Sequence, residues 1–362
     1  MDDYISSIVL NNFRNYSSRK IDFLKGFNVI VGNNGVGKTN LLEAITMFSN
    51  SHGLRNATAE ELINIYQKQK LSNNIDYSLL MNLNSGTKIL ITYGDLKKNI
   101  KINGENIKKN SILNNFLKIT FLIPQMETFF IDGSAVRRKF LDKTAELVFI
   151  NHYENVKKYE YFIKETMKLI TEDKINENWL NIVENKIANL SISIASVRNE
   201  TLSMLNKIFV DYTNNFPTGI LSIEGEIENL MNNKKAEEVK EYIIQQLKNN
   251  RSIDSQTKKT NLGIHRSDLY VYNREKNIKA NLCSNGEQKM LLISLILVRC
   301  IFSKQTEIGF PVLLLDEVCS HLDENTKQKL FDELKNLNIQ IFLTGLCEED
   351  FKGLSTNNYI KL

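Results

Sequence analysis

The sequence predicts an α/β fold that combines a mixed sheet with a helical lobe and has no long coiled coil. A short β-branched run at residues 27–31 leads into a glycine-rich loop and then a helical pattern. A continuously apolar strand at 311–315 is typical of a parallel sheet covered on both faces. From about residue 143 to 250, apolar residues recur at helical spacing. A stretch of ~30 helical residues reaches only about 45 Å, far less than a long coiled coil.

Length and composition indicate a globular protein with more than one lobe. The chain has 362 residues, which exceeds the usual ~100–200 of a single domain. Hydrophobic residues make up 42% of the chain and charged residues 24%, which excludes a mainly disordered protein. Because the net charge is only +4, any surface for nucleic acid must come from local clustering of basic residues.

Cysteine usage and hydropathy favour a cytoplasmic protein. The four cysteines lack the spacing of metal ligands and are predicted to be reduced thiols. The residues after Met1 do not show the basic region and apolar core of a signal peptide. The most apolar run, 290–298, has nine residues, against the ~20 needed to cross a bilayer. We therefore expect no contact with a membrane.

The loop after the strand at 27–31 has the Walker A pattern G-x-x-x-x-G-K-T. Glycines allow backbone dihedrals closed to other residues, so successive N–H groups can converge on phosphate oxygens at the start of a helix. Lys38 would place its charge on the β- and γ-phosphates of ATP, and the Thr39 hydroxyl would hold Mg²⁺. The alternative is a glycine turn that binds nothing. The predicted nucleotide-binding residues of the loop are Gly32, Asn33, Asn34, Gly35, Val36, Gly37, Lys38 and Thr39.

Two acids, Asp316 and Glu317, follow the apolar strand at 311–315. Acids at the exit of a buried strand are costly without a positive partner, and Mg²⁺ bound to a nucleotide is such a partner. As a Walker B pair, Asp316 would support the Mg²⁺ shell and Glu317 would polarise the attacking water as general base. With Lys38 they form the predicted catalytic set. The alternative is a solvated helix N-terminus, where the helix dipole favours acids.

A Ser-x-Gly segment, Ser284 to Gly286, precedes the apolar run at 290–298. It resembles the signature loop of ABC-type ATPases, which completes the γ-phosphate site of a second subunit with a hydroxyl, a glycine backbone and a helix N-terminus. An ordinary helix cap at Ser284 is the alternative and is compatible with that role.

Two further segments complete the set of motifs. Ser320-His321-Leu322-Asp323, just after Walker B, resembles the D-loop, with Asp323 as its candidate residue. Gln125, after a strand-like run at 119–123, stands where a Q-loop residue would stand. The order Walker A, signature, Walker B and D-loop is that of ABC ATPases.

The wide separation of Walker A and Walker B resembles the SMC-like branch of ABC ATPases and, within it, the RecF family of bacterial recombination mediators. The resemblance extends over nearly the whole chain and implies an ABC-type P-loop ATPase head. It adds Arg14 and Asn40 to the predicted nucleotide-binding residues. The matching segments are Asn12 to Tyr16, Gly35 to Ile45, Asp132 to Asp142 and Gly263 to Leu269.

The chain departs from the family pattern at several positions. Ala135 and Ile264 replace prolines, and Ser267 replaces an acid. Thr344 follows the strand at 339–343, where transporter ATPases carry a switch histidine. The identity of the γ-phosphate sensor is therefore open.

The resemblance implies an ATP-dependent homodimer that binds double-stranded and gapped DNA. It also implies work with RecR and RecO, and indirectly RecA, and slow ATP hydrolysis used as a switch. The ATP-binding lobe would comprise residues 1–123, with Walker A, and 301–362, with Walker B and the D-loop. Residues 124–300 would form a mainly helical lobe that carries the signature.

Strand candidates and basic pairs fill in the remaining chain. Residues 4–10, 19–31, 76–84, 87–93 and 98–103 suggest an antiparallel sheet, with Asn103-Gly104 as a hairpin turn. Scattered basic pairs such as Lys97-Lys98 and Arg137-Arg138 favour contact with a duplex backbone over sequence readout.

Other functions stay open. An SMC-like ATPase with another role in DNA maintenance, or a nucleotide-binding interaction protein with little turnover, also fits the motifs. A nuclease-coupled ATPase is disfavoured because only about 45 residues follow Walker B. A transporter subunit is disfavoured by the long helical insert and by the missing switch histidine.

Overall fold

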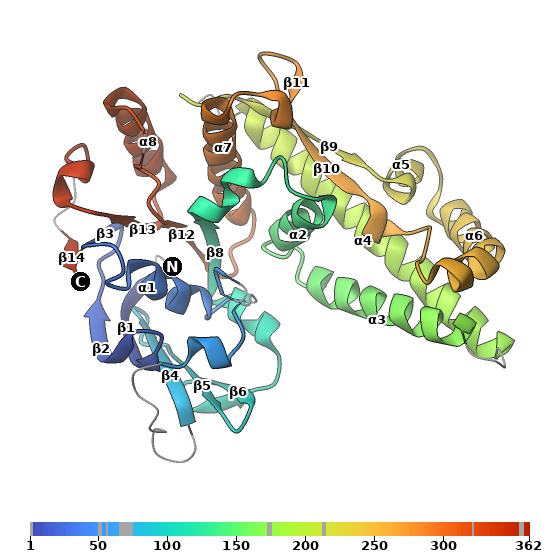
Figure 1. The fold of residues 1–362 in the computed structure, drawn as a ribbon, viewed down its shortest axis with the longest axis horizontal. Helices are drawn as coiled ribbons and strands as arrows, with labels where there is room; N and C mark the ends of the chain where they lie inside the picture. The colour runs from blue at the N-terminus through green and yellow to red at the C-terminus, as the bar shows by residue number, and fades with distance from the viewer. Residues whose placement is uncertain are drawn as a thin grey trace. The chain divides into compact units, whose positions relative to one another are not determined.

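The chain folds into two compact units, one formed by residues 1–126 and 303–362 and the other by residues 127–302 (Figure 1). The structure is a computed structural model that describes residues 3–49, 53–55, 57–64, 75–171, 176–211, 215–320, 322–354 and 358–362. It has the predicted α/β architecture.

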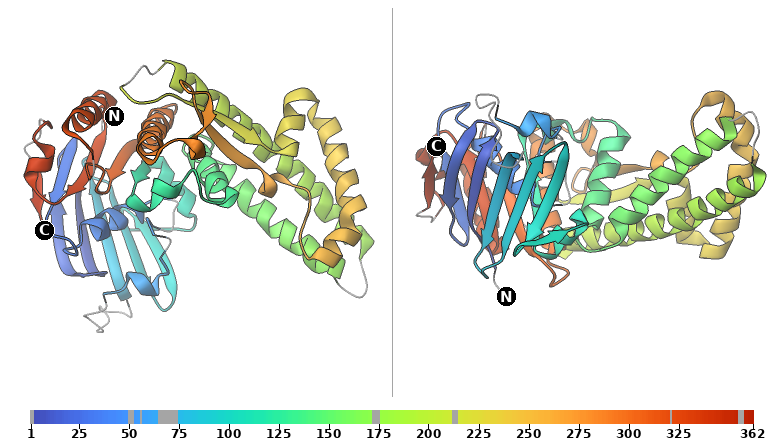
Figure 2. Two further views of the ribbon diagram at one scale, coloured as in Figure 1. Left: turned by 45° about the horizontal axis from the view of Figure 1, so that its top comes forward. Right: turned by 90° about the horizontal axis from the view of Figure 1, so that it is seen from below.

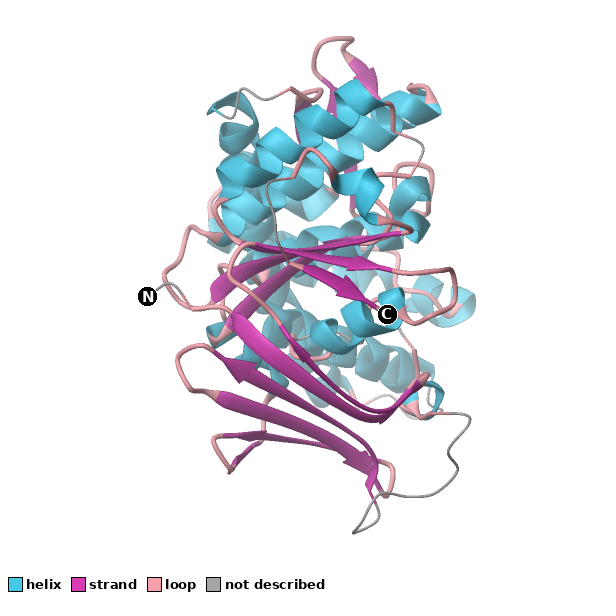
Figure 3. Cartoon of the chain, turned by 90° about the vertical axis from the view of Figure 1, so that its left-hand side faces the viewer, coloured by secondary structure: helices cyan, strands magenta, loops and turns pink. Residues whose placement is uncertain are grey.

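An antiparallel sheet forms one part of the first unit (Figure 3). Buried and more exposed residues alternate along its strands, so one face is apolar and packs inward. Asn103 and Gly104 have φ of 51° and 91° in the turn between its last two strands, which confirms the predicted hairpin. In spatial order the strands are β2 (Tyr16–Asp22), β1 (Ile5–Phe13), β4 (Ile75–Leu83), β5 (Lys88–Gly94), β6 (Lys97–Ile102) and β7 (Glu105–Ile107).

A parallel sheet forms the other part of the first unit. Its central strand β13 is buried at every position, as expected for a strand covered on both faces. Helix α8 (Glu324–Leu337) connects β12 to β13. In spatial order the strands are β14 (Tyr359–Lys361), β3 (Phe27–Val31), β13 (Gln340–Gly345), β12 (Phe310–Leu315) and β8 (Leu117–Leu122).

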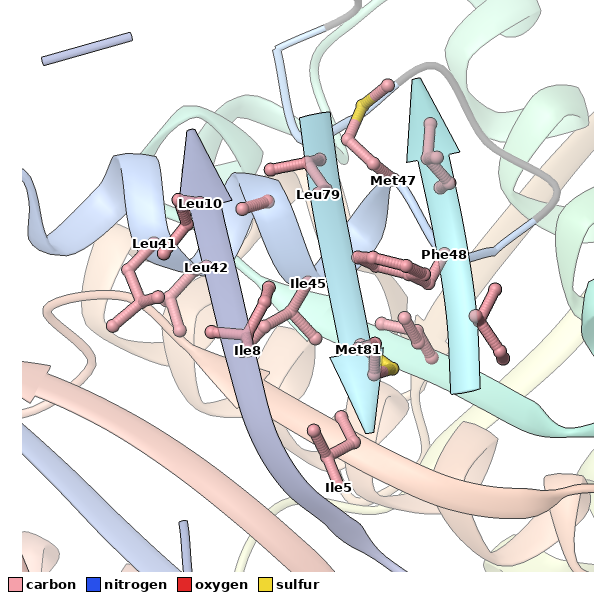
Figure 4. Packing of buried hydrophobic residues seen from close by; sticks show 14 of the residues in the cluster. Ile5, Ile8, Leu10, Leu41, Leu42, Ile45, Met47, Phe48, Leu79 and Met81 are labelled. Carbon is pink, nitrogen blue, oxygen red and sulfur yellow. The ribbon is translucent and has the colours of Figure 1, made fainter. Parts of the chain in front are cut away.

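Helix α1 (Lys38–Thr46) lies between these two sheets (Figures 2 and 4). Its apolar residues join one buried cluster with residues of both sheets, and Figure 4 shows Leu41, Leu42 and Ile45 beneath β1 and β4. Because α1 begins at Lys38, this packing fixes the start of the helix directly after the glycine loop.

The expectation that residues 19–31 belong to the antiparallel sheet is wrong for their second half. β2 ends at Asp22, and residues 27–31 form β3 of the parallel sheet. The burial patterns give the reason: β2 has mainly exposed or half-buried positions, whereas β3 is buried from Asn28 onward. Gly26, with φ of 88°, lies in the turn that carries the chain from one sheet to the other.

The second unit is mainly helical, with a small sheet. Its longest described helix, α4, has 35 residues, or about 52 Å, so no long coiled coil occurs among the described residues. The helices are α2 (Ser134–Ala145), α3 (His152–Thr171), α4 (Glu177–Asp211), α5 (Glu226–Asn233), α6 (Ala236–Thr257) and α7 (Asn285–Ser303). The strands are β9 (Gly219–Glu224), β10 (Asp268–Asn273) and β11 (Ile278–Lys279), in the order β11-β10-β9.

Strand β9 lies inside the stretch that the sequence predicts as helical. Buried positions alternate with less buried ones along β9, and the strand pairs with β10, which is distant in sequence. The helical periodicity on both sides hid this short strand, because six residues are too few to show a clear period of two.

Candidate nucleotide-binding site

The carboxyl edge of the parallel sheet gathers the motifs of the first unit. The glycine loop follows β3, Asp316 follows β12, Thr344 lies near the end of β13, and Gln125 follows β8. These strands run parallel, so their carboxyl ends share one edge, where ligands of α/β folds usually bind.

Walker A and Walker B meet through their side chains. The Thr39 hydroxyl donates to Asp316 Oδ2 at 2.8 Å, although the two residues are separated by 277 positions in the chain. A hydroxyl beside a carboxylate is an oxygen pair that suits Mg²⁺, which in nucleotide sites is held by one or two carboxylates together with phosphate oxygens. The residues present therefore fit the predicted metal.

The glycine loop encloses the Lys38 side chain. Lys38 is 4% exposed, and its ammonium donates to the carbonyl oxygens of Gly32 and Asn33 at 2.6 and 3.0 Å. Asn33, Asn34 and Gly35 are exposed at the tip of the loop. The Lys38 ammonium therefore lies beside the exposed loop, at the start of α1.

The turn between β1 and β2 supports this loop, which the sequence motif alone did not reveal. Asn15 Nδ2 donates to the Val36 carbonyl at 2.8 Å, and the Tyr16 hydroxyl donates to the Gly37 carbonyl at 3.0 Å. A Cβ on Gly37, whose φ is 114°, would lie 2.6 Å from Asn15 Nδ2. Burial raises the pKa of Tyr16 to about 12, so its hydroxyl remains a donor at neutral pH. The matching segment Asn12 to Tyr16 was the available signal.

Arg14 and Asn40, which the family resemblance added, lie in the same region. The Arg14 guanidinium binds both carboxylate oxygens of Glu43 at 2.8 and 3.0 Å, and Glu43 is fully buried. Asn40 donates to Asn15 Oδ1 at 2.9 Å and accepts from Arg55 at 3.3 Å. Their direct contact with a nucleotide stays a prediction.

Thr344 connects the two Walker B acids. Its hydroxyl donates to Asp316 Oδ1 at 2.7 Å and accepts from the backbone N–H of Glu317 at 2.9 Å. Glu317 has φ of 51°, a left-handed conformation that is uncommon for a residue with a side chain.

Gln125, the candidate Q-loop residue, is exposed in a short 3₁₀ helix, Pro124–Thr128, beyond β8.

The signature segment caps α7 in the second unit. Glu287 accepts from the Ser284 N–H at 3.0 Å, and the Glu287 N–H donates to Ser284 Oγ at 3.4 Å, which together form a capping box. Ser284 and Gly286 are exposed.

In the first unit, Asp323 of the predicted D-loop caps α8 by accepting from the Thr326 N–H at 3.0 Å. His321 of the predicted D-loop lies outside the described residues.

Two of the segments that match the family pattern, Asp132 to Asp142 and Gly263 to Leu269, contact each other in the second unit. Arg137 binds both oxygens of Asp268 at 2.8 and 2.7 Å, and Arg138 donates to the Ser267 carbonyl at 2.7 Å. Ser267 also donates to both oxygens of the buried Glu228, at 2.7 and 2.8 Å. An acid at position 267 would place a second carboxylate there, so serine suits this environment.

A buried ion network extends from this contact. Arg198, 2% exposed, binds Asp142 through two nitrogens at 2.9 and 2.8 Å and Glu228 at 2.8 Å. Burial raises the pKa of Asp142, but Arg198 and His152 outweigh it and hold the pKa well below the usual range. Sequence reasoning missed Arg198 and Glu228 because no local pattern marks them.

Among the described residues, none of the helices is long and apolar enough to cross a membrane.

Comparison with known proteins finds matches over nearly the whole chain. A family model described as "RecF/RecN/SMC N terminal domain" matches residues 4–361. Proteins named DNA replication and repair protein RecF from Rickettsia conorii and Rickettsia peacockii are 37% and 36% identical to the chain over 360 and 359 residues. Each alignment covers 98% of this chain and 97% of the relative.

Solved structures agree with that match. The recombination mediator protein RecF-ATP in the RecFOR pathway has a TM-score of 0.84 at 25% identity, over 97% of this chain and 95% of that one. An Smc head domain from Pyrococcus furiosus, bound to the C-terminal domain of ScpA, has a TM-score of 0.53 at 17% identity, over 97% of this chain and 92% of that one, which shows the fold alone. The fold is therefore that of an SMC-like ABC ATPase head. The chain belongs to the RecF family of DNA replication and repair proteins.

Proposed function

We propose that this protein is an ATP-dependent DNA-binding protein of replication and recombinational repair. ATP would bind on the glycine loop, two copies would associate around it, and the dimer would hold double-stranded and gapped DNA. With RecO and RecR, it would help to load RecA. The observation that carries the proposal is the 2.8 Å contact between Thr39 and Asp316, because it joins the two halves of an ATP site from opposite ends of the chain.

The residues of the first unit would divide the work at the nucleotide. The N–H groups of residues 32–39 would surround the phosphates, with Lys38 on the β- and γ-phosphates. Thr39 and Asp316 would hold Mg²⁺, whose charge neutralises the developing negative charge on the phosphates. Glu317 would take a proton from the attacking water. Slow hydrolysis would then act as a switch that releases the dimer.

The signature segment supports the dimer part of the proposal. Ser284 and Gly286 are exposed at the N-terminus of α7, a helix of 19 residues, where the helix dipole favours a phosphate group. The division into an ATP-binding lobe and a helical lobe carrying the signature, and the roles of Asp323 and Gln125, belong to the same proposal.

The test is ATP turnover measured with and without gapped duplex DNA. The proposal expects low turnover that rises when gapped DNA is added. Stable ATP binding without turnover in either condition would favour an interaction protein. An ATP turnover rate that is the same with and without DNA would indicate a role outside DNA maintenance.

A further inference from the structure

Thr344 has a position from which it contacts both Walker B acids. It is fully buried near the end of β13, the strand between the Walker A strand β3 and the Walker B strand β12. The hydrogen bonds to Asp316 Oδ1 and from the Glu317 N–H use the same hydroxyl oxygen.

The direction of both bonds follows from the chemistry of the groups. A carboxylate only accepts and a backbone N–H only donates, so the single hydroxyl proton of Thr344 goes to Asp316. That proton cannot simultaneously reach a γ-phosphate oxygen. Thr344 therefore acts on a reaction at this site through its neighbours and does not replace a switch histidine as a direct phosphate contact.

The bond from the Glu317 N–H to Thr344 holds a residue whose backbone is in an unfavourable conformation. A left-handed conformation is unfavourable for a residue with a Cβ, and Glu317 adopts it with φ of 51°. Its N–H is held by Thr344, and its carbonyl accepts from the Ser320 N–H at 3.0 Å. These two bonds fix the backbone that carries the predicted general base.

We propose that Thr344 is a positioning residue that aligns Asp316 and Glu317 with the Walker A loop. The chain of contacts runs from Thr39 to Asp316, then to Thr344 and the Glu317 backbone. The proposal deepens the function proposed above and rests on it. Thr344 sets the direction of the Asp316 carboxylate and of the Glu317 side chain, and the nucleotide itself is bound by other residues.

The main variant is Thr344→Val, which keeps the shape but removes the hydroxyl. ATP turnover should fall about 100-fold, as expected for a misplaced reacting group, with ATP affinity unchanged. Thr344→Ser should retain turnover because it keeps the hydroxyl. The matched control is Thr120→Val: Thr120 is a buried threonine of the same sheet, and its hydroxyl has no hydrogen-bond partner among the described residues.

A double variant separates positioning from general damage. In a Glu317→Gln background, adding Thr344→Val should lower the residual rate by clearly less than it lowers the rate of the wild type, because one of the two groups that Thr344 positions is already removed. A full additional loss of activity there would contradict the proposal, as would a Thr344→Val protein with wild-type turnover.

Amide exchange tests the same idea without turnover. The Glu317 N–H should exchange faster in Thr344→Val than in Thr344→Ser or Thr120→Val, with other core amides unchanged. Unchanged exchange at Glu317 would overturn the proposal. Thr344→Ala repeats the test if the valine variant does not fold. A wild-type protein without turnover would count against the proposed function, while exchange would still decide whether Thr344 holds Glu317.

Discussion

Asn15 Nδ2 donates a 2.8 Å hydrogen bond to the carbonyl oxygen of Val36 in the phosphate loop. Tyr16 makes a similar bond to the next carbonyl, that of Gly37, at 3.0 Å. Both bonds use carbonyl oxygens, so neither bond occupies an N–H group of the loop. The turn between β1 and β2 thus braces the loop from the side of the antiparallel sheet.

Asn15→Ala should weaken ATP binding by roughly 2- to 13-fold, because one hydrogen bond that orders the loop is worth about 0.5–1.5 kcal/mol. The control is Asn11→Ala on β1, whose side chain contacts Ser78 and Ser18 instead of the loop. Calorimetric titration with a non-hydrolysable ATP analogue measures the effect. If both variants bind like the wild type, Asn15 does not order the loop.

The sequence predicted the elements that are encoded in short contiguous segments. Walker A could be identified because eight neighbouring residues and their flanking strand and helix carry the whole signal. The contact of Thr39 with Asp316 follows once β3, which precedes Walker A, and β12, which precedes Walker B, lie in one sheet. Asn15 and Thr344 could not be identified in this way. Their roles depend on bonds to single backbone atoms across different strands, which no spacing in the sequence records.

The division of the strands shows the same limit. Residues 19–31 look like one extended segment, and only tertiary packing decides that β2 and β3 enter different sheets. The network of Arg198 with Asp142 and Glu228 joins three helices, and its members are ordinary charged residues in their local sequence.

Lys38→Ala and Glu317→Gln should separate binding from hydrolysis. Removing the Lys38 charge weakens phosphate binding in the ground state, so this variant should largely lose ATP affinity. Glu317→Gln should bind ATP but hydrolyse it slowly and accumulate a long-lived ATP-bound dimer. Nucleotide titration and sedimentation measure the two outcomes. Equal affinity of wild type and Lys38→Ala would refute the assignment of the loop.

Ser284→Arg should prevent association driven by ATP while leaving ATP binding by the monomer intact. A bulky cation cannot be accommodated in the closely packed γ-phosphate interface that the signature segment is proposed to form. Ser252→Arg, at an exposed position on α6, makes the same change in charge elsewhere in the unit. Sedimentation with an ATP analogue should show a dimer for the control only. A normal dimer of Ser284→Arg would exclude the signature role.

Arg198→Met should destabilise the second unit by about 3–5 kcal/mol, since it leaves two buried carboxylates without their cation. Lys157→Met removes an exposed ion pair and should cost less than about 1 kcal/mol. Denaturant unfolding at neutral pH compares them. A loss for Arg198→Met no larger than that for Lys157→Met would show that the network adds little stability.

The loss of stability in Arg198→Met should depend on pH. Arg198 and His152 hold the folded-state pKa of Asp142 below its unfolded value of about 3.9. The wild-type network is therefore fully stabilising above that pH and loses its contribution as the pH falls below it. In Arg198→Met, burial should instead raise the pKa of Asp142, so the stability difference between the two proteins should narrow in acid.

We expect ATP to control DNA binding, and a duplex titration at several salt concentrations measures this control. A dimer places two sets of Lys and Arg along one duplex, and each phosphate contact adds roughly −0.9 to the slope of log K against log salt. With an ATP analogue, affinity should be higher and the slope steeper than without nucleotide, with little preference for sequence. Identical affinities and slopes in the two states would show that ATP does not control DNA binding.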